Sequence, residues 1–360
     1  MGCNSGAIET WAKAAIERRW PGAQIRHIKA IRGDASDRRF WRISIAAGPR
    51  AAAPATAILI DLGPHDLPAY ARILNLVKEP LAEPPWVNVH RLFVSIGAPV
   101  PSLYECDPAR RAMLVEDVGE LSLSNAARRP GANAADLFRL AADELIRIHV
   151  EGTRKAGFDC VARSINYDSR LFEWEMREFL EVGLAAVAPG ADSAAIRPEL
   201  AMLAAGLDKI PRVLSHRDYH GSNLFVQPRP ERSRKAGPRL RIVDFQDALM
   251  APAAQDLAVL LTTRDADEIV TPAIERRILD FYLAGLARRK FSAPGESDFI
   301  AGYRLCVLQH ALKTIGRFEA FERGGKPGYR VYVPHALAQA RRMLAAMPGE
   351  FPALRAALGA

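Results

Sequence analysis

The segment VLSHRDYHGSNLFV, residues 213–226, decides the fold class of this 360-residue chain. It places His216, Arg217, Asp218 and Asn223 in the pattern H-R-D-x-x-x-x-N, which is typical of a phosphoryl-transfer catalytic loop. In such a loop the aspartate accepts the proton of the attacking hydroxyl, and the asparagine gives a neutral oxygen to Mg²⁺. The alternative is a polar turn, because Asp, Gly, Ser and Asn all favour turns.

A second segment, RIVDFQD at 241–247, favours the catalytic interpretation. It is an apolar strand that ends in Asp244, 26 residues after the loop aspartate. A nucleotide-bound Mg²⁺ needs a charged oxygen ligand opposite Asn223, and Asp244 takes the place of the aspartate in Asp-Phe-Gly, with Gln246 in place of the glycine. Asp256 follows at a predicted helix start, where it either compensates the helix dipole or holds the catalytic loop by hydrogen bonds.

The hydrophobic pattern around these segments predicts an α+β fold of two lobes, a small β-rich one and a large helical one. The first lobe, residues 1–120, should carry a helix at 8–19, strands at 25–31, 38–45 and 56–60, helices at 67–79 and 87–96, and a strand at 112–116. The second lobe, residues 121–360, should carry helices at 134–149, 168–182 and 196–208 and a run of helices over 274–347. Within it, the short strands 213–215, 224–226 and 240–245 predict a hairpin embedded in helices.

Composition excludes several classes of protein. With 49% apolar and 25% charged residues, the chain is globular and can bury a large core. The net charge of +8 raises the question of a nucleic-acid partner, but the densest basic stretch, 229–241, lacks aromatic residues that stack on bases, so none is expected. Four cysteines without a C-x-x-C pair, and the lack of a signal peptide or a membrane-spanning stretch, predict a cytoplasmic protein with reduced thiols and no membrane partner.

Beyond these motifs, the chain resembles the aminoglycoside phosphotransferase/choline kinase superfamily. Within it, the chain is similar to the anomeric N-acetylmuramate/N-acetylglucosamine kinases of bacterial cell-wall recycling. The catalytic loop alone indicates the superfamily, whereas the DFQDA, LQ-x-x-LK and GKPGY segments point to the sugar-kinase branch. The similar segments are GDASDRRFWRI at 33–43, MLVEDVG at 113–119, NYDSRLFEWEMREF at 166–179, SHRDYHGSNL at 215–224, IVDFQDALMAPAAQDLAVLL at 242–261, LQHALKTIGRF at 308–318 and GGKPGY at 324–329.

The resemblance implies a bilobal protein-kinase-like fold that uses ATP and Mg²⁺ to phosphorylate the C1 hydroxyl of an amino sugar, a small-molecule acceptor. Asp218 would be the base, with His216 and Arg217 as further catalytic residues of the same loop, and Asn223 and Asp244 would be the magnesium ligands. The remaining nucleotide contacts would come from a first hairpin over the phosphates and from a hinge whose backbone meets adenine; these are Gly33, Asp34, Ala35 and Ser36, and Glu116, Asp117 and Val118.

The third predicted strand lacks the lysine that typical kinases place on the ATP phosphates. The chain has Ala57-Ile58-Leu59-Ile60-Asp61 there, as the sugar-kinase branch does. We hypothesise that an arginine of the preceding strand supplies the charge. Because alternate residues of a strand share a face, Arg38 and Arg42 should point one way and Arg39 the other. Solvated arginines at the strand edge are the alternative.

The acceptor site is less defined by sequence. Glu175 could hydrogen-bond sugar hydroxyls or be a solvated helix carboxylate, and His220 could orient the loop or touch the sugar. Lys313 and Arg317, one helical turn apart, could neutralise the carboxylate of N-acetylmuramate. His149 is expected to be a packed structural residue.

Three other functions stay open. An aminoglycoside, choline or another small hydroxyl compound could be the acceptor in the same chemistry. A metal-dependent hydrolase could be built on His216, His220, Asp218, Asp244 and Asp256, although the two histidines do not lie in an H-E-x-x-H helix. A pseudokinase that only binds ligands would explain the missing lysine, but it would have no chemical need for the intact Asp and Asn positions.

Overall fold

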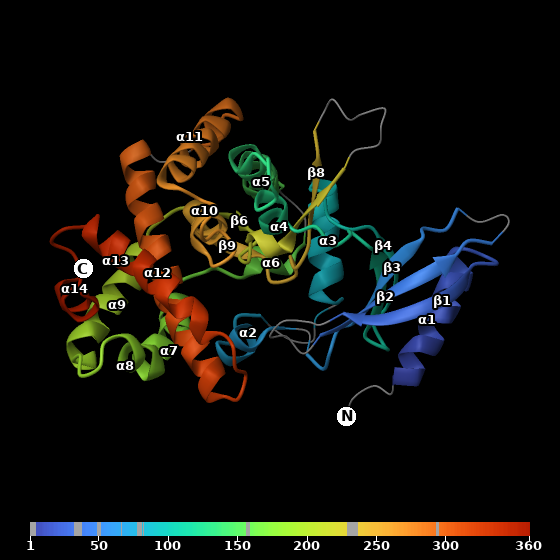
Figure 1. Ribbon diagram of the computed structural model, residues 1–360, viewed down its shortest axis with the longest axis horizontal. Helices are drawn as coiled ribbons and strands as arrows, with labels where there is room; N and C mark the ends of the chain where they lie inside the picture. Colours follow the sequence, from blue (N-terminus) through green and yellow to red (C-terminus); the bar gives the residue numbers. More distant parts are fainter. Residues whose placement is uncertain are drawn as a thin grey trace.

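The computed structural model describes residues 5–31, 38–48, 52–65, 67–77, 81, 83–155, 159–228, 237–292 and 295–360. In the N-terminal part of these residues, five antiparallel strands form one sheet in the order β1-β2-β3-β5-β4 (Figure 1). The strands are β1 (Gln24–Ile31), β2 (Arg39–Ala46), β3 (Thr56–Asp61), β4 (Leu103–Asp107) and β5 (Ala112–Glu116). The predicted strands at 25–31, 38–45, 56–60 and 112–116 are therefore confirmed.

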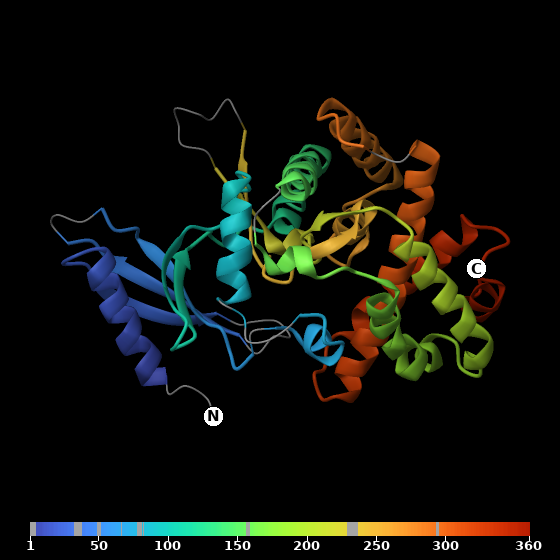
Figure 2. The ribbon, with the colours of Figure 1, turned by 180° about the vertical axis from the view of Figure 1, so that it is seen from behind.

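The sheet is buried on both faces, because alternate residues of its central strands enter different cores. Leu114 of β5 packs in a core with Trp11 and Ile16 of α1 (Ser5–Arg19), which covers the outer face. Val115 belongs to the main core with Phe93 of α3 (Pro85–Ser95). Figures 1 and 2 show α3 between the sheet and the helical part. The sheet is thereby joined to the helices by one continuous apolar core.

The C-terminal part is mostly helical, as predicted. Its central element is α12 (Glu296–Arg323), which has Cys306, Leu312 and Ile315 fully buried and lies beside α7 and α13 in Figures 1 and 2. The other α-helices are α4 (Leu123–Ala127), α5 (Ala134–Arg147), α6 (Val161–Ser164), α7 (Ser169–Glu178), α8 (Leu184–Val187), α9 (Ser193–Asp208), α10 (Ala253–Thr262), α11 (Pro272–Arg288), α13 (Val333–Ala345) and α14 (Pro352–Leu358). None of the helices within the described ranges is both long and apolar enough to cross a membrane.

The predicted bilobal α+β fold class is confirmed, but of two local predictions one holds in part and one is wrong. The predicted hairpin embedded in helices is formed by β7 (Leu224–Gln227) and β8 (Arg239–Ile242), which pair antiparallel, whereas β6 (Arg212–Ser215) pairs with β9 (Leu249–Pro252), a strand that the sequence did not predict. The predicted helix at 67–79 is a single turn, α2 (Ala69–Ile73), which ends before the left-handed Asn75. The division of the chain at residue 120 stays a prediction.

This pairing brings the two candidate catalytic segments together. The chain passes from β6 to β7 through residues 216–223 and from β8 to β9 through residues 243–248. Because β6 pairs with β9 and β7 with β8, both connections run from one strand pair to the other. The fold therefore places the Asp218 loop beside the Asp244 loop.

Candidate active site

A buried carboxylate fixes the backbone of the catalytic loop. Asp256, in the first turn of α10, accepts hydrogen bonds from the backbone amides of His216 and Arg217, each at 2.8 Å. Burial alone would raise its pKa, but His149, whose Nε2 lies 3.0 Å from the carboxylate, contributes to a net lowering. Of the two roles considered for Asp256, the loop-holding one is confirmed. His149 is fully buried against Tyr282, so it is the packed residue that the sequence predicted.

The loop is also packed tightly against helix α4. A Cβ atom added at Gly221 would lie 2.0 Å from the hydroxyl of Ser124. A side chain at this position would require the Ser124 hydroxyl to turn away and the loop or α4 to shift slightly, so the close approach favours glycine. His216 is fully buried, and its Nε2 lies 3.0 Å from the Val243 carbonyl. His216 thus ties the catalytic loop to the Asp244 loop and does not face a ligand site.

Asn223 and Asp244 lie next to each other at the ends of β7 and β8. The amide of Val243 donates to the Asn223 carbonyl at 3.0 Å. Asp244 itself has a left-handed backbone with φ of 63°, which turns the chain at the end of the strand. The side-chain nitrogen of Asn223 donates to the Asp218 carbonyl at 3.0 Å and lies 3.2 Å from Nε2 of His220. This leaves the side-chain oxygen of Asn223 as the atom that suits a cation.

The chemistry of these donors fits Mg²⁺. An amide oxygen and a carboxylate are hard oxygen ligands, and Mg²⁺ in nucleotide sites is held by one or two carboxylates together with substrate phosphates. Among the described residues, no group of three or more His, Cys, Asp or Glu side chains could hold a metal ion. Such a group is what the zinc hydrolase alternative would need. The donor set therefore suits a nucleotide-bound magnesium better than a zinc hydrolase.

Asp218 is kept in its charged form. Burial would raise its pKa, but the positive charges of Arg217 and Lys313 outweigh this effect and lower it. A carboxylate that is ionised at neutral pH and lies at the wall of a pocket can accept a proton from a bound hydroxyl group. The electrostatics therefore suit the role that the sequence predicted for Asp218.

A buried ion network surrounds Glu175 of α7, which is 1% exposed. Its carboxylate accepts from Arg217 at 2.8 Å, lies 3.0 Å from Nζ of Lys313, and accepts from the Tyr167 hydroxyl. Burial would raise the pKa of Glu175, but the charges of Lys313 and Arg217 lower it strongly. Glu175 is therefore not a solvated carboxylate, and Arg217, Lys313 and Tyr167 already surround it; its contact with a sugar hydroxyl stays a prediction.

The side chain of Arg217 makes its contacts within the protein. Its guanidinium pairs with Glu175, and its carbon Cζ lies 4.0 Å above the ring of Tyr70 in α2. Tyr70 is 3% exposed. Its helix α2 follows strand β3 and so belongs to the N-terminal part of the chain. Arg217 is therefore the contact between the catalytic loop and a helix of the N-terminal part.

The three arginines of the second strand have different partners. Arg38 donates to the Asp244 carboxylate at 2.9 Å, and Arg39 donates to Asp61 at 2.6 Å. Arg42 pairs with Asp117 at 2.6 Å and also with Glu120. Arg42 is thus used at the hinge, and Arg38 is the arginine of this strand that lies at a candidate metal ligand.

The predicted hinge, residues 116–118, begins at the end of strand β5 and contacts β7. The Glu116 carboxylate pairs with Arg241, and the Val118 carbonyl accepts from the side-chain amide of Gln227 at 3.0 Å. The Val118 carbonyl is therefore already engaged within the protein. The predicted phosphate-covering residues Gly33, Asp34, Ala35 and Ser36 lie outside the described residues.

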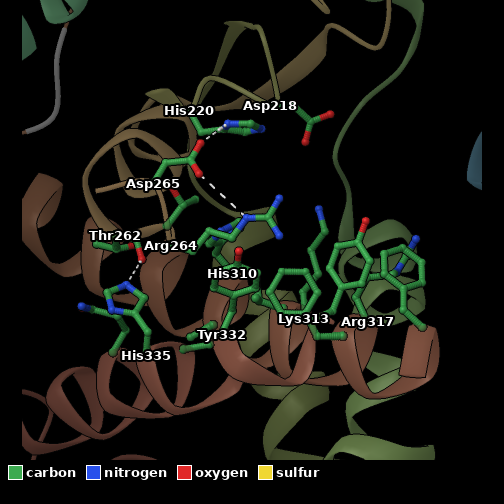
Figure 3. A pocket seen from close by; sticks show the side chains of 18 residues that line it. Asp218, His220, Thr262, Arg264, Asp265, His310, Lys313, Arg317, Tyr332 and His335 are labelled. Carbon is green, nitrogen blue, oxygen red and sulfur yellow. Dashed lines mark hydrogen bonds and ion pairs between the residues drawn. The ribbon is translucent and has the colours of Figure 1, made fainter. Parts of the chain in front are cut away.

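A pocket of about 190 Å³ opens beside Asp218, between the catalytic loop and helices α12 and α13 (Figure 3). Its wall contains His220, whose Nδ1 lies 2.8 Å from Asp265; Asp265 also accepts from the Ser222 amide at 2.9 Å. Figure 3 shows Lys313 and Arg317 of α12 along one side of the pocket. The pocket is lined by Asp218, His220, Thr262, Thr263, Arg264, Asp265, His310, Ala311, Lys313, Thr314, Arg317, Phe318, Phe321, Tyr329, Tyr332, His335, Ala336 and Gln339.

The pocket contains two basic residues that were named from sequence and several residues that were not. Lys313 and Arg317 share it as predicted, but they also pair with Glu175 and Glu178, at 3.0 and 2.7 Å. Sequence reasoning missed Asp265, Arg264 and His310. Asp265 could have been considered from sequence, because a histidine such as His220 in a loop needs a hydrogen-bond partner and Asp265 follows the predicted helix that contains Asp256. No spacing rule in the sequence identifies Arg264 or His310.

The sequence profile described as "Phosphotransferase enzyme family" matches residues 27–291 of this chain. A relative from Caulobacter vibrioides named N-acetylmuramate/N-acetylglucosamine kinase is 30% identical over 261 residues, which are 69% of this chain. The matched region spans 65% of that relative's own length.

Solved structures share the fold at low sequence identity. A choline kinase from Cryptosporidium parvum has a TM-score of 0.59 at 11% identity, covering 98% of this chain and all of its own (100%). An ADP-bound aminoglycoside phosphotransferase, APH(2'')-Ib, has a TM-score of 0.54 at 12% identity, covering 94% of this chain and 97% of its own. At this identity the likeness concerns the fold.

Proposed function

The chain belongs to the phosphotransferase enzyme family, and from this premise we propose that it transfers the γ-phosphoryl group of ATP to the anomeric hydroxyl of an N-acetylated amino sugar. The name of the Caulobacter relative supports the sugar class, and the resemblance of the DFQDA and GKPGY segments supports the anomeric position. Bound ADP in a solved structure of the same fold supports an adenine nucleotide as the donor. The product would be a sugar 1-phosphate for cell-wall recycling.

One observation carries the proposal for a hydroxyl-rich acceptor. Two polar atoms in the wall of the pocket beside Asp218, Oγ1 of Thr263 and Nδ1 of His310, are buried and have no hydrogen-bond partner among the described residues. Buried polar groups in native proteins are nearly always paired, either with protein atoms or with ordered water, so these two atoms favour a site for an acceptor that brings donors and acceptors over a site for an apolar one. A sugar ring carries both, whereas the trimethylammonium end of choline carries neither.

The chain's own residues divide the work of the reaction. Asp218 accepts the proton of the attacking hydroxyl, and Asp256 and His216 hold the loop that aims it. Arg38 is placed to meet phosphate charge in the absence of the strand lysine. Mg²⁺, when bound by Asn223 and Asp244, would neutralise charge on the phosphates. Glu175 keeps Arg217 and Lys313 in place and does not itself touch the reacting atoms.

A coupled assay of ADP release tests the proposal directly. Wild-type protein is given ATP, Mg²⁺ and one acceptor at a time: N-acetylglucosamine, N-acetylmuramate, kanamycin or choline. We expect turnover with the amino sugars, and loss of that turnover in Asp218→Asn while ATP still binds. Turnover with only kanamycin or only choline would show that the acceptor is not an N-acetylated amino sugar. Nucleotide binding without turnover of any acceptor would support a pseudokinase.

A further inference from the structure

Arg264 occupies an aromatic cage inside the acceptor pocket. Its guanidinium carbon lies 4.6 Å from the ring centre of Tyr332, 5.5 Å from that of Phe318 and 5.6 Å from that of Tyr329. Three aromatic faces around a cation are the arrangement by which proteins bind quaternary ammonium groups. Here the protein's own arginine lies over the three rings that a cationic acceptor would use.

The charge of the pocket points the same way. The residues that line it include three cationic side chains, Arg264, Lys313 and Arg317, and two carboxylates, Asp218 and Asp265. Asp218 is the proposed base, and Asp265 is bonded to His220 and to the Ser222 amide. Burial lowers the pKa of His310 to about 3, so this histidine adds no charge at neutral pH. Among the lining side chains, cations exceed carboxylates by one, although Lys313 and Arg317 also pair with Glu175 and Glu178, which do not line the pocket. The cations of the lining suit an anionic substituent.

The guanidinium of Arg264 has neighbours on several sides. The three rings lie around its central carbon, and its Nε lies 3.8 Å from the carboxylate of Asp265, which is bonded to His220 of the catalytic loop. Figure 3 shows the guanidinium end pointing into the pocket on the side of Lys313. A planar guanidinium with fixed faces can receive a carboxylate edge-on through parallel hydrogen bonds.

From this geometry we propose that Arg264 is the residue that selects acceptors with a carboxylate substituent over neutral and cationic ones. The proposal rests on the proposed function, because it concerns the acceptor of that same site. It predicts that N-acetylmuramate is preferred over N-acetylglucosamine, from which it differs by a lactyl ether that carries one carboxylate. It also assigns the aromatic cage a role in specificity, since the rings keep the guanidinium in place.

The test is the ratio of kcat/KM for N-acetylmuramate to kcat/KM for N-acetylglucosamine. In Arg264→Gln the ratio should fall by roughly 10- to 100-fold, the effect of losing hydrogen bonds between charged groups. Arg264→Lys keeps the charge without the planar fork and should lose less. Arg128→Gln is the matched control: this exposed arginine donates to the Asp267 carbonyl of the same turn from outside the pocket, and its ratio should equal that of the wild type.

The outcomes separate this proposal from the function on which it rests. If the wild type phosphorylates neither sugar, the proposed function fails. If the wild type phosphorylates both but the ratio in Arg264→Gln stays within twofold, Arg264 does not select the carboxylate. An equal fall for both sugars would also overturn the proposal, because it would mean that Arg264 supports the pocket walls. Circular dichroism and the KM for ATP identify a variant that is merely misfolded, in which case Arg264→Lys alone decides.

Discussion

The guanidinium of Arg217 lies 2.8 Å from the carboxylate of Glu175, and this buried ion pair joins the catalytic loop to helix α7. The same carboxylate lies 3.0 Å from Lys313, so one buried anion holds two cations, one from the loop and one from the acceptor pocket. The catalytic loop and the pocket are thus parts of one electrostatic unit.

Removing this carboxylate should destabilise the protein strongly. Glu175→Gln leaves Arg217 and Lys313 without a charged partner in a buried site, which costs about 3–5 kcal/mol of unfolding free energy. Glu178→Gln is the control, because its pair with Arg317 is partly exposed and should contribute less than about 1 kcal/mol. Urea unfolding of both variants measures the difference. Equal stability of the two variants would contradict the role given to Glu175.

The carboxylate of Asp265 predicts a pH dependence of stability. Burial would raise its pKa, but its bonds to His220 and Ser222 lower it far below the usual range of an aspartate. A group with a depressed folded pKa stabilises the protein above its unfolded pKa, and this contribution is lost as the pH falls toward the folded value. Wild type should therefore exceed Asp265→Asn by about 1.5–3 kcal/mol at pH 7.

Urea unfolding of both proteins from pH 7 to pH 3 checks this sign. The difference should first grow as the pH falls through the range in which His220 becomes protonated, because Asp265 raises the pKa of that histidine. It should then shrink below about pH 4, as Asp265 itself becomes protonated. A difference that keeps growing below about pH 4 would show that the Asp265 pKa is raised and would refute the assigned charge state.

Arg38 should matter for nucleotide binding. Its contact with Asp244 places its guanidinium at the candidate metal ligand, where it can reach phosphate oxygens. Arg38→Gln should weaken ATP binding by about 10- to 100-fold, as expected for hydrogen bonds between charged groups. Arg39→Gln is the neighbouring control, because Arg39 pairs with Asp61 of β3 and should change ATP affinity less than about threefold. Calorimetric titration with ATP and Mg²⁺ decides; equal effects would remove Arg38 from the phosphate site.

A single carboxylate also organises the loop that carries Tyr329 into the acceptor pocket. One oxygen of Glu322 accepts from the backbone amides of Gly328, Tyr329 and Arg330, at 2.7, 2.7 and 2.9 Å. These bonds lower the pKa of Glu322, so the carboxylate stays charged. The loop depends on this acceptor for its shape.

Glu322→Ala removes that acceptor and should raise KM for the sugar about tenfold, because the loop must then be ordered when the acceptor binds. KM for ATP should not change. Glu350→Ala, which removes an exposed carboxylate elsewhere, is the control. A change in KM for ATP of the same size as that for the sugar would mean that the loop does more than line the acceptor pocket.

The parts of the fold that follow from local pattern were predictable. Four of the five strands of the sheet, the long helices and the order of the two lobes follow from the spacing of apolar residues, whereas β4 was not predicted. The pairing of β6 with β9 was not predictable in this way, because it depends on a long-range choice between similar short apolar strands. The single turn of α2 was missed for a related reason: helical periodicity continues past Asn75, whose left-handed backbone ends the helix.

The same distinction between local pattern and long-range contact applies to the residues of the candidate site. Asp218, Asn223 and Asp244 were found because their chemistry requires fixed spacings within one loop and one strand end. Glu175 was named from sequence, but its burial between Arg217 and Lys313 could not be predicted, because the three residues come from elements that are distant in the chain. Arg264 was missed because nothing in the sequence marks the aromatic rings of two other elements as its neighbours.

The central claim, transfer of phosphate to the anomeric hydroxyl of an amino sugar, is tested most directly by the phosphorus NMR spectrum of the product formed from ATP and N-acetylglucosamine. We expect a sugar phosphate whose phosphorus signal couples to the single anomeric proton, and we expect no such product with Asp218→Asn. A phosphorus signal coupled to the two protons of C6, or consumption of ATP to inorganic phosphate without a phosphorylated sugar, would contradict it.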